Sequence, residues 1–293
     1  MDAPTFKEES MALVVNNNIM ANSAARHLNN AYGALGTSTE RLASGLRVNS
    51  AADDAAGLAV RELMRSDITS LNQGVRNAND GISMIQTADG ALSVIDEKLI
   101  RMKELAEQAA TGTYTDDQRM IIDSEYQAMA SEITRISNAT DFNGIHLLNG
   151  NISGEGLTIH FGPGNDAAED KYNVSIDTCT AEALGVGLAS GGAGAAVSTQ
   201  ALAEASLEAL DSAIVSKDKV RANLGSMQNR LSATISNLEI QAENLQAAES
   251  RISDVDVATE MTEYTKQQII TQSAVSMLSQ ANSLPQMALS LIG

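Results

Sequence analysis

One uninterrupted stretch, Ser226–Leu284, limits most strongly what this chain can fold into. It contains neither Gly nor Pro, the two residues that most disfavour the interior of a helix. Its apolar residues recur in steps of three and four, as on one face of a helix and close to coiled-coil spacing. They are Leu231, Ile235, Leu238, Ala242, Leu245, Ala248, Ile252 and Val255. A continuous helix of this length would extend for about 90 Å, so its apolar face needs an equally long partner.

A second stripe with the same rhythm predicts that partner in the N-terminal half. Gly74, Gly81 and Gly90 fall inside it, and each costs about 1 kcal/mol relative to Ala in a helix. Buried Ile and Leu contribute about 1.5–3 kcal/mol each, which outweighs that cost once a partner covers them. The stripe consists of Met64, Ile68, Leu71, Val75, Ala78, Ile82, Ile85, Ala88, Leu92, Ile95, Leu99 and Met102.

Shorter elements surround these two helices. Residues 11–40 are predicted as a helix, followed by a turn at Leu46–Asn49. Ser50–Asp53 has the form of a capping box, which predicts the start of the next helix there. A third helix is expected at Asp116–Asn138, and helix resumes from Thr199.

The middle of the chain differs in character. Turn residues separate three short strand-like runs, Ile145–Leu148, Leu157–Phe161 and Tyr172–Ile176. Gly191–Gly194 is predicted to be a flexible linker. The fold class is therefore mainly α: a long antiparallel helical hairpin, a coiled-coil-like bundle of N- and C-terminal helices, with a small β-containing excursion in the middle.

Composition excludes several classes of function. The net charge of −18 argues against a nucleic-acid surface, which needs clustered Lys and Arg. No stretch reaches the roughly 18 apolar residues of a membrane-spanning helix. Aromatic residues are only 3% of the chain, so Ala, Leu, Ile, Val and Met must form its interior, which suits closely packed helices better than a ligand pocket. The lone Cys179 excludes an internal disulfide and is interpreted as a small hydrophobe.

A search for catalytic motifs is negative. The sequence contains no HExxH, no P-loop, no CxxC and no GxGxxG after a strand. His27, His146 and His160 are scattered, and we interpret them as surface or edge-strand residues. Ser216–Lys219 matches an isolated SxxK in a polar helical run, which we interpret as a solvated face. We therefore expect no catalytic, cofactor-binding or metal site, no cofactor, and no enzyme.

The two ends carry the most informative signal. Residues 11–25 and 267–293 contain no charged side chain. Such amphipathic ends in an acidic chain predict burial against one another or against other copies, and many copies would cover them best. Met1–Ser10 is acidic and does not resemble a secretory signal. Met11 is a plausible start, with residues 1–10 an N-terminal extension outside the fold.

Several ordered motifs resemble those of bacterial flagellin, and the match covers about residues 11–150 and 200–293. The stretch Arg41–Ala59 (RLASGLRVNSAADDAAGLA) resembles the N-terminal signature of the family. At the other end, Leu278–Gln286 and the closing Leu289–Ile292 resemble its terminal segment. Further matches are Asn77–Ser83, Ala88–Leu92 and Phe142–Gly144.

This resemblance implies a structural subunit that polymerises with copies of itself into the flagellar filament for swimming motility. It implies residues 11–49 and 254–293 as paired terminal helices forming the filament inner core. Residues 50–144 and 199–253 would form a long-helix outer-layer domain, and residues 145–198 a small β/loop outer element. The implied partners are hook-associated and cap proteins and an export chaperone, with no nucleic acid and no membrane. The implied location is extracellular, in the flagellum, after export through the flagellum's own channel.

The resemblance also implies a contact surface. Arg101, Leu105 and Gln108 share one helix face, and with Glu125 on the next helix they match a subunit-contact surface of the family. In some members an innate immune flagellin receptor recognises the same surface. The plainer interpretation is that Arg101 and Glu125 are ordinary surface charges and Leu105 is packing.

Two other functions remain open from sequence. A flagellar hook–filament junction protein has similar terminal helices but forms short rings, whereas flagellin forms polymers of open-ended length. An amphipathic secreted membrane-active protein, from a different class, would bind liposomes as a monomer and would not self-assemble.

Overall fold

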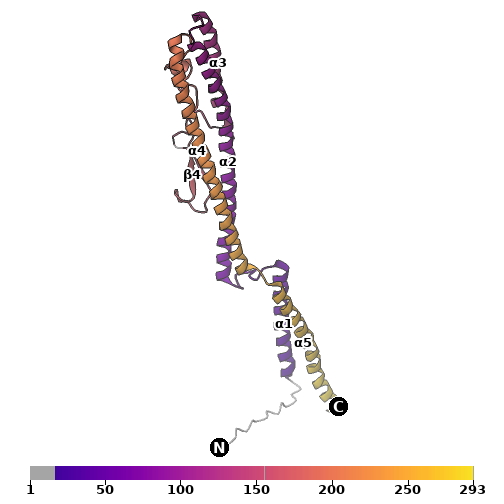
Figure 1. Cartoon of the computed structure of the whole chain (residues 1–293). Helices are drawn as coiled ribbons and strands as arrows, with labels where there is room; N and C mark the ends of the chain where they lie inside the picture. Colours follow the sequence, from indigo (N-terminus) through magenta and orange to yellow (C-terminus); the bar gives the residue numbers. More distant parts are fainter. Residues whose placement is uncertain (1–16, 155, 293) are drawn as a thin grey trace, which may run out of the picture. The chain divides into compact units, whose positions relative to one another are not determined.

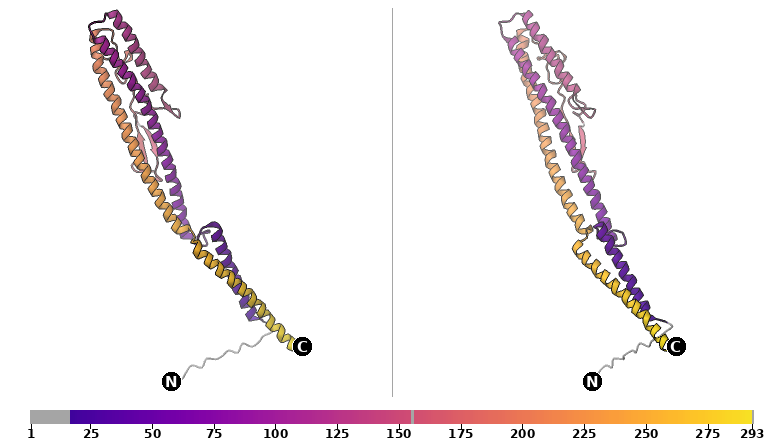
Figure 2. Two further views of the ribbon diagram at one scale, coloured as in Figure 1. Left: turned by 45° about the vertical axis from the view of Figure 1, so that its right-hand side comes forward. Right: turned by 90° about the vertical axis from the view of Figure 1, so that its right-hand side faces the viewer.

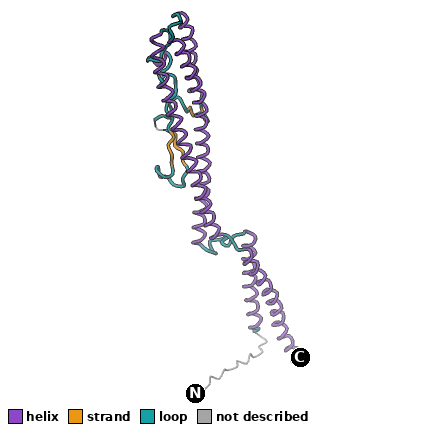
Figure 3. Tube along the Cα trace, in the orientation of Figure 1, coloured by secondary structure: helices purple, strands orange, loops and turns teal. Residues whose placement is uncertain are grey.

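The computed structural model describes residues 17–292 except residue 155, and it divides the chain into two compact units. One unit comprises Met1–Arg65 with Gln246–Gly293, and the other comprises Ser66–Leu245. The expected extension Met1–Ser10 and the start of the first predicted helix lie outside the described residues. Helices dominate, with a few short strands between them (Figure 3), which confirms the mainly α fold class. The elements, in order, are α1 (Ile19–Ser44), α2 (Ala55–Ala110), α3 (Asp116–Ala139), β1 (Asp141–Phe142), β2 (Ile145–His146), β3 (Leu157–His160), β4 (Lys171–Val174), the short 3₁₀ helix η1 (Leu188–Ser190), α4 (Gln200–Ser253) and α5 (Val257–Ile292).

In the first unit, α1 and α5 lie side by side (Figure 1). The side chain of Asn18 caps α1 by accepting a hydrogen bond from the Ala21 amide at 2.9 Å, and it donates another to the Ala281 carbonyl on α5 at 2.7 Å. The buried residues described on these two helices are small ones: Ala31, Ser38, Thr271 and Ala281. Their packing is therefore close but covers little apolar area.

The long C-terminal helix is interrupted, so the prediction of one continuous helix through Ser226–Leu284 was wrong. α4 ends at Ser253 and α5 begins at Val257. The Val255 amide donates to the Gly45 carbonyl at 3.0 Å, and the Arg47 amide donates to the Ser253 carbonyl at 2.7 Å. Asp256 then caps α5, because its carboxylate accepts hydrogen bonds from the Ala258 amide and the Thr259 hydroxyl. A cap and a partner segment distant in sequence thus end the helix without Gly or Pro.

The helix predicted to begin at Ser50 begins one turn later. The Asp53 carboxylate does accept hydrogen bonds from the Ser50 amide at 2.9 Å and hydroxyl at 3.0 Å, but they close a turn. Asp54 is the residue that caps α2, because its carboxylate accepts from the Gly57 amide at 2.9 Å. Only one of the two capping-box hydrogen bonds is therefore present, because the Asp53 amide donates to the Ser50 carbonyl and not to its hydroxyl, and the predicted helix start was wrong.

In the second unit, α2 and α4 run alongside each other, with α3 and the β excursion packed against them (Figure 2). The predicted stripe of α2 is confirmed, since its members from Ala78 to Met102 are buried or packed against the main core cluster. On α4, Leu210, Leu224 and Leu231 face the same cluster. α3 agrees with its prediction to within a residue and starts with a capping box between Thr115 and Gln118.

The middle of the chain contains two antiparallel hairpins, and three of their four strands overlap the predicted strand-like runs. β1 and β2 are joined by Asn143 and Gly144, whose φ values of 52° and 80° are typical of a tight hairpin turn. β3 pairs with β4 from Leu157↔Val174 to His160↔Lys171. The strands are shorter than the predicted runs, and β1 was not predicted.

Two glycines of α2 allow the second hairpin to lie directly on that helix. A Cβ atom at Gly74 would overlap the Phe161 carbonyl, and one at Gly81 would overlap the end of the Ile159 side chain. Between them, the Asn77 side chain donates a hydrogen bond to the His160 carbonyl at 2.8 Å. These glycines, counted above only as a helix cost, make room for the hairpin: its backbone approaches α2 at Gly74, and the Ile159 side chain lies against Gly81.

The segment predicted as a flexible linker is hydrogen-bonded into the fold instead. The Gly194 carbonyl accepts from the Gly187 amide and from the Tyr126 hydroxyl, both at 2.8 Å. The Ser206 hydroxyl on α4 donates to the carbonyls of Ala193 and Ala196. The linker interpretation of Gly191–Gly194 was wrong because its carbonyls have partners on α3 and α4.

Candidate subunit-contact surfaces

Arg101 on α2 and Glu125 on α3 form an exposed ion pair. The Arg101 Nε and Nη2 atoms lie 3.0 and 2.9 Å from Glu125 Oε1, and its Nη1 lies 2.9 Å from Glu104 Oε2. Hydrogen bonds to Glu104 and then Glu125 raise the pKa of the Arg101 guanidinium. The two side chains are 48% and 45% exposed, so this cluster of charges is open to a partner.

The other two predicted residues lie differently. Gln108 is exposed and donates a hydrogen bond to the Tyr114 hydroxyl at 3.1 Å. Leu105 is only 2% exposed and belongs to the main core cluster. The structure therefore presents Arg101, Gln108 and Glu125 on the surface and places Leu105 beneath it.

Apolar residues beside this cluster were not recognised from sequence. Ile100 on α2 and Met120 and Ile121 on α3 are exposed. Ile121 lies one helical turn before Glu125. The exposure of Ile121 could have been predicted from the sequence, because Ile121 lies outside the stripe of Ile122, Tyr126 and Ile133 that α3 buries.

The terminal helices leave a much larger apolar surface uncovered. At about 100° per residue, the exposed apolar residues of α5 spread over the sides that α1 does not cover. They are Val257, Met261, Ile269, Ile270, Val275, Met277 and Met287. Ile19, Met20 and Tyr32 on α1 are exposed as well. Large apolar side chains on a helix are ordinarily buried, so these exposed residues make the surface a candidate for further packing.

The residues that could carry other chemistry are dispersed. His27 and His146 are exposed, and His160 is partly buried. Burial, and then the charge of Asp177, raises the pKa of the Cys179 thiol to about 11. No cluster of three or more His, Cys, Asp or Glu suited to a metal ion occurs within the described residues. Nor does any described helix combine the length and the hydropathy needed to cross a membrane.

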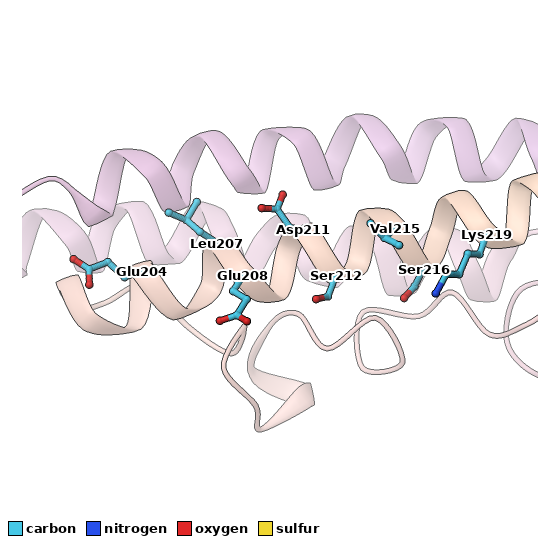
Figure 4. Close-up of a pocket in the computed structure, with 8 residues that line it drawn as sticks. All are labelled: Glu204, Leu207, Glu208, Asp211, Ser212, Val215, Ser216 and Lys219. Carbon is cyan, nitrogen blue, oxygen red and sulfur yellow. The ribbon is translucent and has the colours of Figure 1, made fainter.

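An open groove of about 620 Å³ runs along one face of α4 (Figure 4). Its lining comes from that helix alone: Glu204, Leu207, Glu208, Asp211, Ser212, Val215, Ser216 and Lys219. It is a strip of mixed charged, hydroxyl and apolar side chains that contains no His and no Cys. Its chemistry therefore suits contact with another surface better than catalysis.

Lys217 does not lie on the solvated face expected for Ser216–Lys219. Its side chain is only 2% exposed, and its Nζ lies 2.5 Å from Asp96 Oδ1 and 2.7 Å from Asp218 Oδ1. Desolvation acts to lower the pKa of Lys217, but the hydrogen bonds to Asp218 and Asp96 outweigh it and raise the pKa. The sequence interpretation holds for its exposed neighbours and was wrong for Lys217.

Family models match both ends of the chain. The bacterial flagellin N-terminal helical region matches residues 15–153, and the bacterial flagellin C-terminal helical region matches residues 207–292. The chain is also 41% identical over 288 residues to flagellin FlaB1 of Treponema pallidum (strain Nichols). That alignment covers 96% of this chain and 100% of the relative. This chain belongs to the bacterial flagellin family.

A second relative confirms the predicted function. The flagellar filament 33 kDa core protein of Treponema phagedenis is 42% identical over 288 residues, covering 96% of this chain and 100% of that protein. The chain is a structural subunit of the flagellar filament, and flagellin is a family of structural proteins. One solved structure, a putative flagellar hook-associated protein from Vibrio parahaemolyticus, is similar with a TM-score of 0.55. It is 16% identical and covers 69% of this chain and 100% of that chain, which shows a shared fold alone.

The flagellin motifs found in the sequence have local structural roles. Arg41–Ala59 spans the connection between α1 and α2, where the Arg47 side chain donates to the Ile252 carbonyl at 2.8 Å. Asn77–Ser83 contains the side chain and the glycine on which the β3–β4 hairpin packs. The family signatures therefore mark positions where distant backbone segments meet.

Proposed function

We propose that the subunit joins the filament by burying the apolar sides of α1 and α5 against other copies of itself. In this arrangement residues 11–49 and 254–293 form the inner core of the filament. Residues 50–144 and 199–253 form the surrounding layer, and residues 145–198 lie outside it. The apolar surface of α5 is the observation that supports this proposal.

The energy available from that surface is of the right order. A fully buried aliphatic side chain contributes about 1.5–3 kcal/mol, so a half-exposed one has about 1 kcal/mol still to gain. The seven exposed apolar residues of α5 would then contribute about 7 kcal/mol per subunit. This lies within the range of about 4–15 kcal/mol that association costs in lost freedom of motion. Charged residues, which would oppose such burial, are absent beyond Lys266.

The test is a charge placed on this surface. We expect Ile269→Lys to leave the helix content and thermal unfolding of the monomer unchanged, because Ile269 is 58% exposed. The same variant should not form sedimentable filaments after seeding. Leu188→Lys is the matched control, because Leu188 is 66% exposed but belongs to the excursion assigned to the outside. Filaments of Ile269→Lys with wild-type yield in electron micrographs would refute the proposal.

We also propose that the exposed Arg101, Gln108 and Glu125, with Ile121 beside them, contact a neighbouring subunit, and that Leu105 supports them from the core. Exposed ion pairs add little to the stability of a single chain. Arg101→Glu should therefore lower polymer yield while leaving the melting temperature of the monomer almost unchanged. Arg135→Glu is the control, because it breaks another exposed pair on α3, with Glu132. Equal polymer yields from the two variants would argue against this contact.

The same surface is our candidate for recognition by the innate flagellin receptor. Its three polar side chains are accessible in the unassembled subunit, so the receptor would have to bind monomers. Activation of receptor-bearing cells by Arg101→Glu monomers should fall well below that by wild-type and Arg135→Glu monomers. Undiminished activation would remove Arg101 from the proposal.

We also propose that the subunit has no enzymatic activity. The proposal extends to how the subunit reaches the filament. We infer extracellular delivery through the flagellum's own channel, with an export chaperone and with hook-associated and cap proteins as partners. The family assignment supports this route. A host strain whose flagellar export apparatus is deleted should retain the protein inside the cell, and secretion by that strain would contradict the route.

A further inference from the structure

One charged residue interrupts the buried face of α4. Between Ala203 and Leu224 the buried residues recur in steps of three and four, as in a coiled coil. They are Ala203, Ser206, Leu210, Ala213, Lys217, Val220 and Leu224. Lys217 thus occupies a core position and is the one charged residue among these seven; a polar residue at such a position specifies the register of a coiled coil at a cost in stability.

The partners of Lys217 connect the two long helices. Asp96, at 2.5 Å, comes from α2, and Asp218, at 2.7 Å, comes from α4 itself. A buried charge without a partner is strongly disfavoured. Asp218 is the neighbour of Lys217 on α4, so it stays beside Lys217 whichever residues of α2 face them. Asp96 faces Lys217 only in the observed register.

Two further ion pairs flank this one. Arg221 Nε lies 2.7 Å from Asp89 Oδ1, and Lys103 pairs with Asp211. The three α2 positions, 89, 96 and 103, are seven residues apart and so lie on one side of the helix. Their partners follow in the opposite order along α4. From position 89 to position 103, the charges on α2 are negative, negative and positive. The α4 residues that pair with them, Arg221, Lys217 and Asp211, are positive, positive and negative.

We propose that this pattern of three ion pairs sets the register of α4 against α2, with Lys217 as the decisive positioning residue. A slip of one heptad moves the helices by about 10 Å. In one direction it would bring the buried Lys217 to Lys103, a like-charge pair. In the other it would bring Asp211 to Asp96 and leave Arg221 opposite Ile82, so that only the pair of Lys217 with Asp89 would be attractive. Only the observed register pairs all three charges, and repulsion in the alternatives is how charge patterns achieve specificity.

The register matters for assembly because it fixes how far the Arg101–Glu125 surface lies along the bundle from the exposed face of α4. A slipped subunit would present one of these surfaces about 10 Å out of place. This consequence rests on the proposed function, whereas the register itself is a property of the unassembled subunit.

Spin labels on the full-length monomer can measure the register. Glu97→Cys on α2 and Ser232→Cys on α4 are exposed positions. When the two helices are aligned at the Asp96–Lys217 pair, Glu97 lies opposite position 216 of α4. Ser232 is 16 residues further along α4, which is about 24 Å along the helix axis. The native Cys179 is buried and remains unlabelled. Double electron–electron resonance should give a single distance for the otherwise wild-type chain, and a slip would add a second distance changed by up to about 10 Å.

The decisive variant is Lys103→Asp with Asp211→Lys. It retains three ion pairs in the observed register but makes all α2 positions negative and all α4 positions positive, so slipped registers are no longer opposed. We expect a second distance population. The matched control, Asp89→Arg with Arg221→Asp, exchanges as many charges but leaves like-charge pairs in both slips, so it should keep a single distance.

A single wild-type distance in Lys103→Asp with Asp211→Lys would overturn the proposal, and so would an equal second population in the control. If the double variant does not fold, Lys217→Met decides, because it removes the repulsion with Lys103. A second distance is then expected, and a single one overturns the proposal. A correct register combined with failure to polymerise would count against the proposed function instead.

Discussion

Gly74 offers the sharpest test of how the β3–β4 hairpin is held on α2. A Cβ atom there would overlap the Phe161 carbonyl, and a backbone atom cannot move aside alone. Overpacking of this kind costs about 1–3 kcal/mol, whereas replacing Gly by Ala in a helix gains about 1 kcal/mol. We therefore expect Gly74→Ala to lower the free energy of unfolding by up to about 2 kcal/mol.

Two other glycines on the same helix provide the comparison. Gly90 is exposed, with no atom near the position of a Cβ, so Gly90→Ala should be stabilising by about 1 kcal/mol. At Gly81 the overlap is with the end of the flexible Ile159 side chain, and an intermediate result is expected. Urea unfolding followed by circular dichroism gives the order. If Gly74→Ala were as stable as Gly90→Ala, the hairpin would not be packed on α2 as described.

Three further predictions follow from local contacts. Hydrogen bonds from the Thr259 side chain, then its amide and that of Ala258, lower the pKa of Asp256 from its ordinary 3.8. The stabilisation from a lowered carboxylate pKa is complete above the unfolded value and is lost as pH falls through the folded one. The protection of the Ala258 amide against exchange, measured relative to the unfolded-chain rate at each pH, should therefore fall below about pH 4, and Asp256→Asn, also a good cap, should remove this dependence. The Cys179 thiol, with its pKa at about 11, should react with iodoacetamide at pH 8 only after urea is added. Thr115→Ala should lower stability by about 1 kcal/mol in urea unfolding, and Thr115→Ser by less.

Periodicity predicted the long helices because their stripes are covered within the chain. Leu71 is buried together with Leu238 and Ala242, and all three belong to the two stripes identified without knowing the contacts. The boundaries were less predictable. Nothing near Ser253 marks the end of α4 in the way Gly or Pro would, because the hydrogen bond that holds this break comes from Arg47, about 200 residues earlier.

The candidate contact surface was found in part, and only through the family resemblance. Spacing placed Arg101 and Gln108 on one helix face, but no local pattern pairs Arg101 with Glu125 on another helix. The burial of Leu105 could have been predicted. It follows Met102 by a step of three and so continues the α2 stripe into the core.

Lys217 shows why local polarity misleads. Its neighbours in sequence are charged or hydroxyl-bearing, which favours a solvated face, yet the stripe spacing places position 217 in the core. The two signals conflict, and the conflict is resolved only by Asp96, a residue 121 positions away. A polar residue in register with an apolar stripe is better interpreted as a buried residue that needs a partner.

The same reasoning separates burial within the chain from burial between chains. An apolar stripe predicts that a partner exists, but it does not say which molecule supplies it. Charge supplies the missing information. On α2 and α4 the stripes are flanked by ion pairs, and charged residues occupy the remaining sides. On α5 there is no charge after Lys266, and large apolar residues remain exposed on the sides that α1 does not cover. Beyond Lys266, α5 therefore combines neutral polar residues with exposed apolar ones, which is why we propose that other subunits cover it.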